Sequence, residues 1–106
     1  MPISITPTGG SGSCTTVSCL ADLNHNCPAG LQLIKNGQVV GCKSACLAFN
    51  KPEYCCSGAY SSPNTCKPTS YSRFFKNSCP TAYSYAYDDP TSLATCSGAN
   101  YTINFC

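Results

Sequence analysis

The sequence predicts a mainly β, disulfide-rich fold in which strands at the two ends of the chain enclose a cysteine-rich middle with short helices. Eleven of the 106 residues are cysteine, a density typical of disulfide scaffolds. Apolar and polar residues alternate near both ends, as in β-strands, whereas helical spacing is confined to the middle. Only 9% of the residues are charged and large aliphatic residues are sparse, so disulfide bridges must supply much of the stability.

The first expected strand covers residues 1–7, where Ile3 and Ile5 alternate with polar residues and a proline stands near each end. Because proline lacks a backbone N–H, we expect this strand at the edge of a sheet. Cys14 and Cys19 follow a glycine- and serine-rich loop and enclose a small turn. They provide two covalent anchor points.

A β-hairpin is expected over residues 31–40. Asn36 and Gly37 stand between two short apolar runs, and this dipeptide is typical of a type I′ turn. Cys27 and Cys42 bracket the hairpin, and a bridge between them would close it at its base.

A short helix is expected over residues 43–49. Cys42, Cys46 and Phe49 recur at i, i+4 and i+7, which would place two thiols and an aromatic ring on one helical face. The Asn-Lys-Pro run after Phe49 is a stop signal. The two adjacent cysteines that follow should have different partners, because a bridge between sequence neighbours is strained.

A second short helix is expected between Thr69, which can serve as its N-cap, and Pro80, which ends it. Helical spacing places four of its residues on one face. They are Tyr71, Phe74, Phe75 and Ser78.

Two further strands are expected, over residues 82–88 and 101–106. In the first, Tyr83, Tyr85 and Tyr87 alternate with small or acidic residues and would lie on one side. Two interpretations of these rings stay open: a stacking platform for sugars, or core packing against the second helix.

The charge pattern excludes several kinds of partner and site. The net charge is +2 and the cations are scattered, so the chain lacks the basic patch of a nucleic-acid-binding protein. No apolar run approaches the ~20 residues of a transmembrane helix, although contact with a membrane surface stays open. With a single His25 and a CxxxC rather than a CxxC spacing, we expect no metal site and no cofactor.

The start of the chain and its cysteine count both favour a fragment. No basic segment and apolar run follow Met1, so no signal peptide is recognised, although a disulfide scaffold implies export. An odd cysteine number leaves one thiol unpaired or paired outside the chain. We therefore expect the C-terminal half of a longer secreted protein, whose first half carries the signal and the missing cysteine partner. The alternative is a complete chain with a free or intermolecular thiol.

Five runs of sequence are specific enough to compare with known families. They are PTGGSGSC, CPAGLQL, ACLAFNKPEYCCSGAYSSPNTCKPTSYSRFFKNSCP, AYSYAYDDPTS and NYTINFC. Together they resemble the C-terminal half of a plant thaumatin-like protein, the pathogenesis-related group that includes osmotin. The resemblance implies part of a flattened β-sandwich, residues 1–20 and 82–106, and a complete cysteine-rich lobe, residues 21–79, with a cleft between them.

The resemblance also implies a disulfide pairing. The implied pairs are Cys14 with Cys96, Cys19 with Cys79, Cys27 with Cys42, Cys46 with Cys55, and Cys56 with Cys66. Cys106 is left unpaired, because the corresponding cysteine of the family joins one near the mature N-terminus, in the half that this chain lacks.

Members of the family carry an acidic cleft of one arginine, one glutamate and three aspartates, associated with β-1,3-glucan binding. The last aspartate corresponds to Asp88, or to Asp89 after a one-residue shift; alternatively, both belong to an Asp-Asp-Pro turn. Tyr85 is the candidate ring beside them. Asn100 begins an Asn-Tyr-Thr sequon and is a candidate glycosylation site.

The resemblance implies a secreted antifungal defence protein, apoplastic or vacuolar, that binds β-1,3-glucan or the fungal surface. Glycoside hydrolysis needs two carboxyl groups about 5 to 9.5 Å apart. The four acids of this chain are Asp22, Glu53, Asp88 and Asp89. They offer no plausible pair, so we expect no catalytic residue. A fragment of a weak endo-β-1,3-glucanase and a fragment of an inhibitor or taste-active member remain the alternatives.

Overall fold

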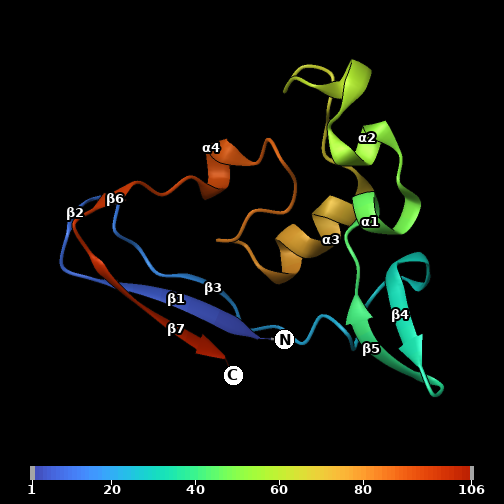
Figure 1. Ribbon diagram of the computed structural model, residues 1–106, viewed down its shortest axis with the longest axis horizontal. Coiled ribbons are helices and arrows are strands. Elements are labelled where there is room, and N and C mark those ends of the chain that lie inside the picture. Colours follow the sequence, from blue (N-terminus) through green and yellow to red (C-terminus); the bar gives the residue numbers. More distant parts are fainter. Residues whose placement is uncertain (1, 106) are drawn as a thin grey trace.

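The computed structural model describes residues 2–105 and has the shape of a flat slab, 42 × 37 × 18 Å. Strands from both chain ends lie in one half of the slab, and most of the short helices lie with a hairpin in the other half (Figure 1). The predicted fold class, a disulfide-rich β fold with a few short helices, is confirmed. Within residues 2–105, none of the helices has the length and apolar character needed to cross a membrane.

The main sheet joins the two ends of the chain. Strand β1 (Ile3–Thr8) lies between β3 (Val17–Cys19) and β7 (Asn100–Phe105), and both pairings are antiparallel. A second, two-stranded ladder pairs β2 (Ser11–Gly12) with β6 (Cys96–Ser97). Backbone hydrogen bonds therefore hold together segments that lie far apart in the sequence.

The prediction that the first strand lies at a sheet edge is wrong, because β1 is the central strand. However, β3 pairs only with the residues from Ile3 to Ile5. On that side, β1 has no partner strand at Pro7, so the missing N–H of Pro7 can face an open position. The edge strands are β3 and β7 instead.

The predicted hairpin is confirmed. Strand β4 (Gln32–Lys35) pairs antiparallel with β5 (Gln38–Cys42). The turn residues Asn36 and Gly37 have φ angles of 53° and 76°, and two successive positive values are required in a type I′ turn. A 3₁₀ turn, η1 (Ala29–Leu31), precedes the hairpin, and its last residue is completely buried.

Helix α1 (Ala45–Phe49) begins two residues later than the predicted start at Lys43. The hydroxyl of Ser44 accepts a hydrogen bond from the backbone N–H three residues on, at 3.1 Å, and so caps the helix. Cys42 therefore belongs to β5 and does not share a helical face with Cys46. The expected end is confirmed, because Asn50 has a left-handed φ of 51°.

Two more helices complete this side of the molecule. Helix α2 (Pro52–Cys55) is a single turn that starts with proline, and a 3₁₀ turn, η2 (Gly58–Tyr60), follows it. Helix α3 (Ser70–Ser78) has the predicted N-cap. The Thr69 hydroxyl accepts from the backbone N–H of Ser72 at 3.3 Å, and the Ser72 hydroxyl accepts from the backbone N–H of Thr69 at 2.8 Å.

Three aromatic rings, one from each α-helix of this side, pack together. The ring centroids of Phe49, Tyr54 and Tyr71 lie 5.2 to 5.8 Å apart in tilted or edge-on arrangements, the geometry that aromatic pairs prefer. Of the four buried apolar residues in the described chain, three are cysteines and the fourth is Leu31. The core is therefore built from sulfur as much as from hydrocarbon.

The expected strand over residues 82–88 is not formed. The segment runs through turns, and the backbone N–H of Asp88 donates to the carbonyl oxygen of Tyr85 at 3.3 Å. Helix α4 (Asp89–Ser92) follows at once, with Pro90 in its first turn. The alternating tyrosines favour a strand, but the hydrogen bonds of the Asp88 side chain, described below, stabilise the turns instead.

Five disulfides cross-link the described residues. They are Cys14–Cys96, Cys19–Cys79, Cys27–Cys42, Cys46–Cys55 and Cys56–Cys66, the same pairs as those implied by the resemblance. Cys106, which is predicted to be unpaired, lies outside the described residues.

Candidate functional site

Asp88 lies at the centre of a hydrogen-bond network between α3 and α4, and it is only 8% exposed. Its Oδ2 accepts from the backbone N–H of Ser84 at 3.0 Å and from the Ser84 hydroxyl at 2.8 Å. Its Oδ1 accepts from the Thr91 hydroxyl at 2.7 Å. The carboxylate therefore folds residues 84–91 around itself, which is how aspartate side chains stabilise turns.

Lys76 of α3 supplies the positive charge that balances Asp88. Its Nζ lies 3.1 Å from Oδ2 of Asp88. It also donates to the carbonyl oxygen of Ala82 at 3.2 Å and to the hydroxyl of Ser92. These contacts attach the segment on both sides of Asp88 to α3.

Burial raises the pKa of Asp88, but hydrogen bonds from Thr91, Ser84 and Lys76 outweigh burial and hold the pKa well below its ordinary value of 3.8. Asp88 stays ionised in mildly acidic solution and therefore has no proton to donate as a general acid. Both carboxylate oxygens accept hydrogen bonds from the protein, and Lys76 balances the negative charge. Asp88 therefore stabilises the turn.

An outer hollow of about 330 Å³ opens between α3 and residues 84–91. Its wall contains the paired charges just described, the threonine bonded to Asp88, one further cation and two tyrosine rings. These residues are Arg73, Lys76, Tyr85, Tyr87, Asp88 and Thr91.

An inner hollow of about 250 Å³ lies between α1, α2, α3 and the start of the same segment. Rings and a disulfide form much of its wall, with one acid and one base: Tyr54, Tyr71, Phe75, the Cys46–Cys55 bridge, Glu53 and Lys67. The two hollows share Ser72, Ser84 and Tyr85. They therefore adjoin along α3.

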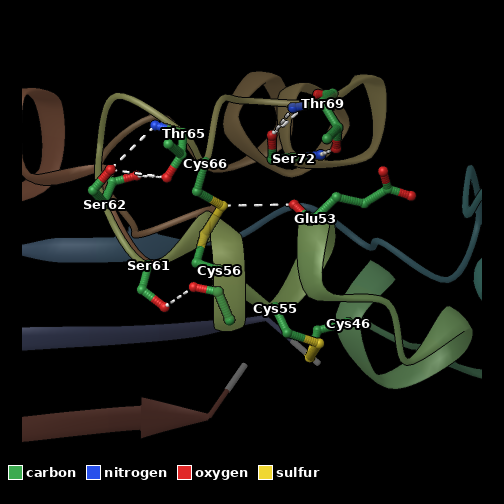
Figure 2. Close-up of a disulfide and its surroundings, with 11 residues drawn as sticks. Cys46, Glu53, Cys55, Cys56, Ser61, Ser62, Thr65, Cys66, Thr69 and Ser72 are labelled. Carbon is green, nitrogen blue, oxygen red and sulfur yellow. Dashed lines mark hydrogen bonds between the residues drawn. A yellow bond between two sulfur atoms is a disulfide. The ribbon is translucent and has the colours of Figure 1, made fainter.

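Figure 2 shows the disulfides beside the inner hollow, with the Thr69–Ser72 capping box next to them. The Sγ of Cys66, bridged to Cys56, lies 3.5 Å from the carbonyl oxygen of Glu53. A bridged sulfur has no proton to donate, so this is a close contact that packs α2 against the bridge. The Glu53 side chain points away from that bridge in the same view.

The three tyrosines expected on one strand face are separated. Tyr85 is half-buried and lines both hollows, and Tyr87 lines only the outer one. Tyr83 lines neither of them and is 47% exposed. Its hydroxyl donates to the carboxylate of Asp89, and this hydrogen bond raises the pKa of Tyr83 above 10.0.

The remaining candidates lie on the surface. The exposed Asp89 begins α4 and is not in the wall of either hollow. Asn100 is the exposed first residue of β7, paired with Thr8. Within residues 2–105, no three histidine, cysteine or acidic side chains gather in a way that could hold a metal ion.

Sequence reasoning missed the residues that shape the outer hollow: Arg73, Lys76, Ser84 and Thr91. One signal was available, because a hydroxyl three residues after an aspartate is typical of side-chain-stabilised turns. No comparable signal pairs Lys76 with Asp88, since their contact depends on how the whole segment folds back onto α3.

The chain matches the profile described as the Thaumatin family over residues 1–106. It is 59% identical, over 106 residues, to the pathogenesis-related thaumatin-like protein 3.5 of Cryptomeria japonica, covering 100% of this chain and 44% of that protein. It is 58% identical, over 98% of its length, to the pathogenesis-related protein 5 of Arabidopsis thaliana, again covering 44% of that protein. A Prunus avium protein named glucan endo-1,3-beta-glucosidase is 52% identical over 100% of this chain and 44% of its own length. The chain thus spans less than half the length of these curated relatives.

Proposed function

The chain belongs to the thaumatin family, and on that premise we propose that it is part of an antifungal plant defence protein that binds β-1,3-glucan of the fungal surface. The binding site in this proposal is the depression formed by the inner and outer hollows. The observation that carries it is the position of Tyr85, which lines both hollows. Sugar rings present one apolar face, and an amphipathic phenol ring suits that face.

The size and lining of the depression support an oligosaccharide as the ligand. Two adjoining hollows offer room for consecutive rings of a chain rather than for a single small molecule. The hydroxyl of Ser84 lies in the shared wall with Tyr85, and because its proton is donated to Asp88 it can accept a hydrogen bond from a sugar hydroxyl. Mixed aromatic and hydroxyl walls provide both stacking and hydrogen bonds to sugar hydroxyls.

The state of Asp88 favours binding over hydrolysis. Glycosidases need one carboxyl group that is protonated and a second that is ionised, on the two sides of the bond. Asp88 is held ionised by Lys76 and its hydroxyl partners and cannot be the acid. Glu53 lines only the inner hollow, Asp88 lines only the outer one, and Asp89 lines neither, so no two acids share a hollow. Hydrolysis by the longer protein is the second candidate, favoured by the name of the Prunus avium relative.

We further propose that additional strands of a longer, secreted protein cover the exposed side of the main sheet. The edge strand β7 carries three exposed apolar side chains, Tyr101, Ile103 and Phe105. Open edges and apolar faces of this kind need partners, and the relatives are more than twice as long as this chain. In this proposal, the other part of the protein holds the signal peptide, the remaining acids of the cleft and the partner of Cys106. Asn100 of this chain carries a glycan.

Retention on insoluble β-1,3-glucan tests the proposed binding. We expect the oxidatively folded chain to be retained without release of reducing sugar, and Tyr85→Ala to elute several-fold earlier. Tyr83→Ala is the matched control, because it removes an exposed tyrosine outside both hollows. Elution of the wild-type chain with a non-binding protein would overturn the proposal, and release of sugar would favour the hydrolase.

A further inference from the structure

Tyr85, which lines both hollows, lies on a segment without regular structure. Residues 79–88 connect α3 to α4 through turns and bends, with no helix or strand among them. A side chain on such a segment binds a ligand well only if other contacts hold its backbone in place, because otherwise the segment must be ordered on binding. The contacts that hold Tyr85 are therefore part of any site that uses it.

Asp88 closes a turn around Tyr85. Ser84, the residue before Tyr85, donates two hydrogen bonds to Oδ2 of Asp88, from its backbone N–H at 3.0 Å and from its hydroxyl at 2.8 Å. The backbone N–H of Asp88 donates to the carbonyl oxygen of Tyr85 at 3.3 Å. The backbone is thus held on both sides of the Tyr85 side chain.

Lys76 attaches this turn to α3. Its Nζ lies 3.1 Å from Oδ2 of Asp88, the oxygen that also accepts both hydrogen bonds from Ser84. It donates as well to Ala82, which precedes Tyr85, and to Ser92, which follows it. Helix α3 is the longest helix within residues 2–105 and its first turn is closed by a capping box. Lys76 therefore connects the turn to a firmly built element.

The same contacts set the direction of the Ser84 hydroxyl. A carboxylate only accepts hydrogen bonds, so the proton of this hydroxyl is directed at Asp88 and its lone pairs remain for a ligand. Ser84 can then accept from a sugar hydroxyl but cannot donate to it. Because Ser84 and Tyr85 line both hollows, a ring face and a hydroxyl proton would be recognised in the same place.

We propose that Lys76 is a positioning residue of the saccharide site. Through Asp88 it holds Tyr85 for a sugar ring and keeps the Ser84 hydroxyl oriented to accept a hydrogen bond. Asp88 then acts on the ligand through these two neighbours and not by direct contact. This role rests on the proposed saccharide-binding function, and every contact that it uses lies within this chain.

Calorimetric titration of the oxidatively folded chain with laminaritetraose, a β-1,3-glucan fragment, tests this role. Lys76→Met keeps the length of the side chain and removes its charge. We expect it to weaken binding by roughly three- to tenfold, because a loosened Tyr85 must be ordered when the sugar binds. Lys76→Arg restores a cation opposite Asp88 and should recover part of the lost affinity. Lys35→Gln is the matched control, because it removes the same charge at the tip of the β4–β5 hairpin, and it should bind like wild type.

A double-mutant cycle shows whether Lys76 acts through Tyr85. If it does, Lys76→Met should weaken binding little further in a chain that already carries Tyr85→Ala. Additive losses would overturn the positioning role, because Lys76 would then act on the sugar independently. Val17→Ala, in β3 and outside both hollows, is a destabilised control. A loss of affinity in this control as large as that in Lys76→Met would also overturn the role, since reduced stability alone would then explain both.

Amide hydrogen exchange at Ser84 adds a measurement without ligand. Lys76→Met should speed this exchange, because the carboxylate that accepts the Ser84 N–H is no longer held against α3, whereas Lys35→Gln should leave it unchanged. If wild type binds laminaritetraose and Lys76→Met binds it equally well, glucan binding stands and the positioning role fails. If wild type does not bind laminaritetraose, the proposed function fails and the positioning role fails with it.

Discussion

Replacing Asp88 by asparagine removes a negative charge to which four donors are directed. These are the backbone N–H and hydroxyl of Ser84, the hydroxyl of Thr91 and the Nζ of Lys76. Asparagine keeps the shape and one oxygen, and its amide can turn towards Thr91, whose hydroxyl is able to accept. What is lost is the charge opposite Lys76, which then stays in a largely covered position without a counter-ion.

Hydrogen bonds to a charged group contribute about 1.5 to 3 kcal/mol each, and Lys76 is only 23% exposed. We expect Asp88→Asn to lower the free energy of unfolding by about 2 kcal/mol. With a urea dependence of about 1.5 kcal/mol per molar, the midpoint should fall by roughly 1.3 M. Asp89→Asn is the matched control, because Asp89 is exposed and should cost less than about 0.5 kcal/mol.

The same substitution should change how stability depends on pH. The pKa of Asp88 is lower in the native protein than its ordinary value of 3.8. The ionised carboxylate therefore contributes fully to the free energy of unfolding above pH 3.8, and this contribution is lost as the pH falls from 3.8 towards the native pKa. Urea midpoints measured from pH 7 down to pH 2 should therefore fall less steeply in Asp88→Asn than in wild type. Midpoints that coincide at pH 7, or equal acid slopes in both proteins, would refute the anchoring role of Asp88.

Three further predictions concern single side chains. The phenol of Tyr83 should titrate above its ordinary pKa of 10.0 in an ultraviolet pH titration. Asp89→Asn should lower this pKa towards 10.0, because the hydrogen bond to Asp89 is the largest cause of the shift. An identical titration in the variant and in wild type would contradict this. Leu31→Ala should lower the free energy of unfolding in urea by about 2 to 5 kcal/mol, because Leu31 is completely buried. The control, Leu47→Ala, lies at a site that is 70% exposed and should change this free energy by under about 0.5 kcal/mol. Thr69→Ala should cost about 1 kcal/mol and speed amide exchange in the first turn of α3, and equal exchange rates would argue against the capping box.

Local signals in the sequence predicted the elements that local interactions determine. Asn36 and Gly37 set the hairpin because their positive φ angles are intrinsic to the turn. Thr69 set the start of α3 because its hydroxyl bonds to a backbone group only three residues away. In both cases the residues that decide the structure are sequence neighbours.

Signals failed where distant contacts decide the structure. The tyrosines at 83, 85 and 87 have the period of a strand, yet the ion pair between Asp88 and Lys76 holds the segment against α3. The first strand looked like an edge because of its prolines, but β3 is too short to reach Pro7. The outer hollow arises from these same non-local contacts, so its residues could not be assigned from spacing.

The disulfides of this molecule suggest an order in which it folds during synthesis. The bridge that brackets the β4–β5 hairpin spans 15 residues and the two bridges around α2 span 9 and 10, whereas Cys14–Cys96 spans 82. Closing a loop costs about 0.6 kcal/mol more for each doubling of length, so the longest bridge starts about 2 kcal/mol behind the shortest. The partner strand β7 also leaves the ribosome last among the described strands, and translation is slow compared with local loop closure. The two short bridges around α2, Cys46–Cys55 and Cys56–Cys66, can therefore form while β1 still lacks its partner β7.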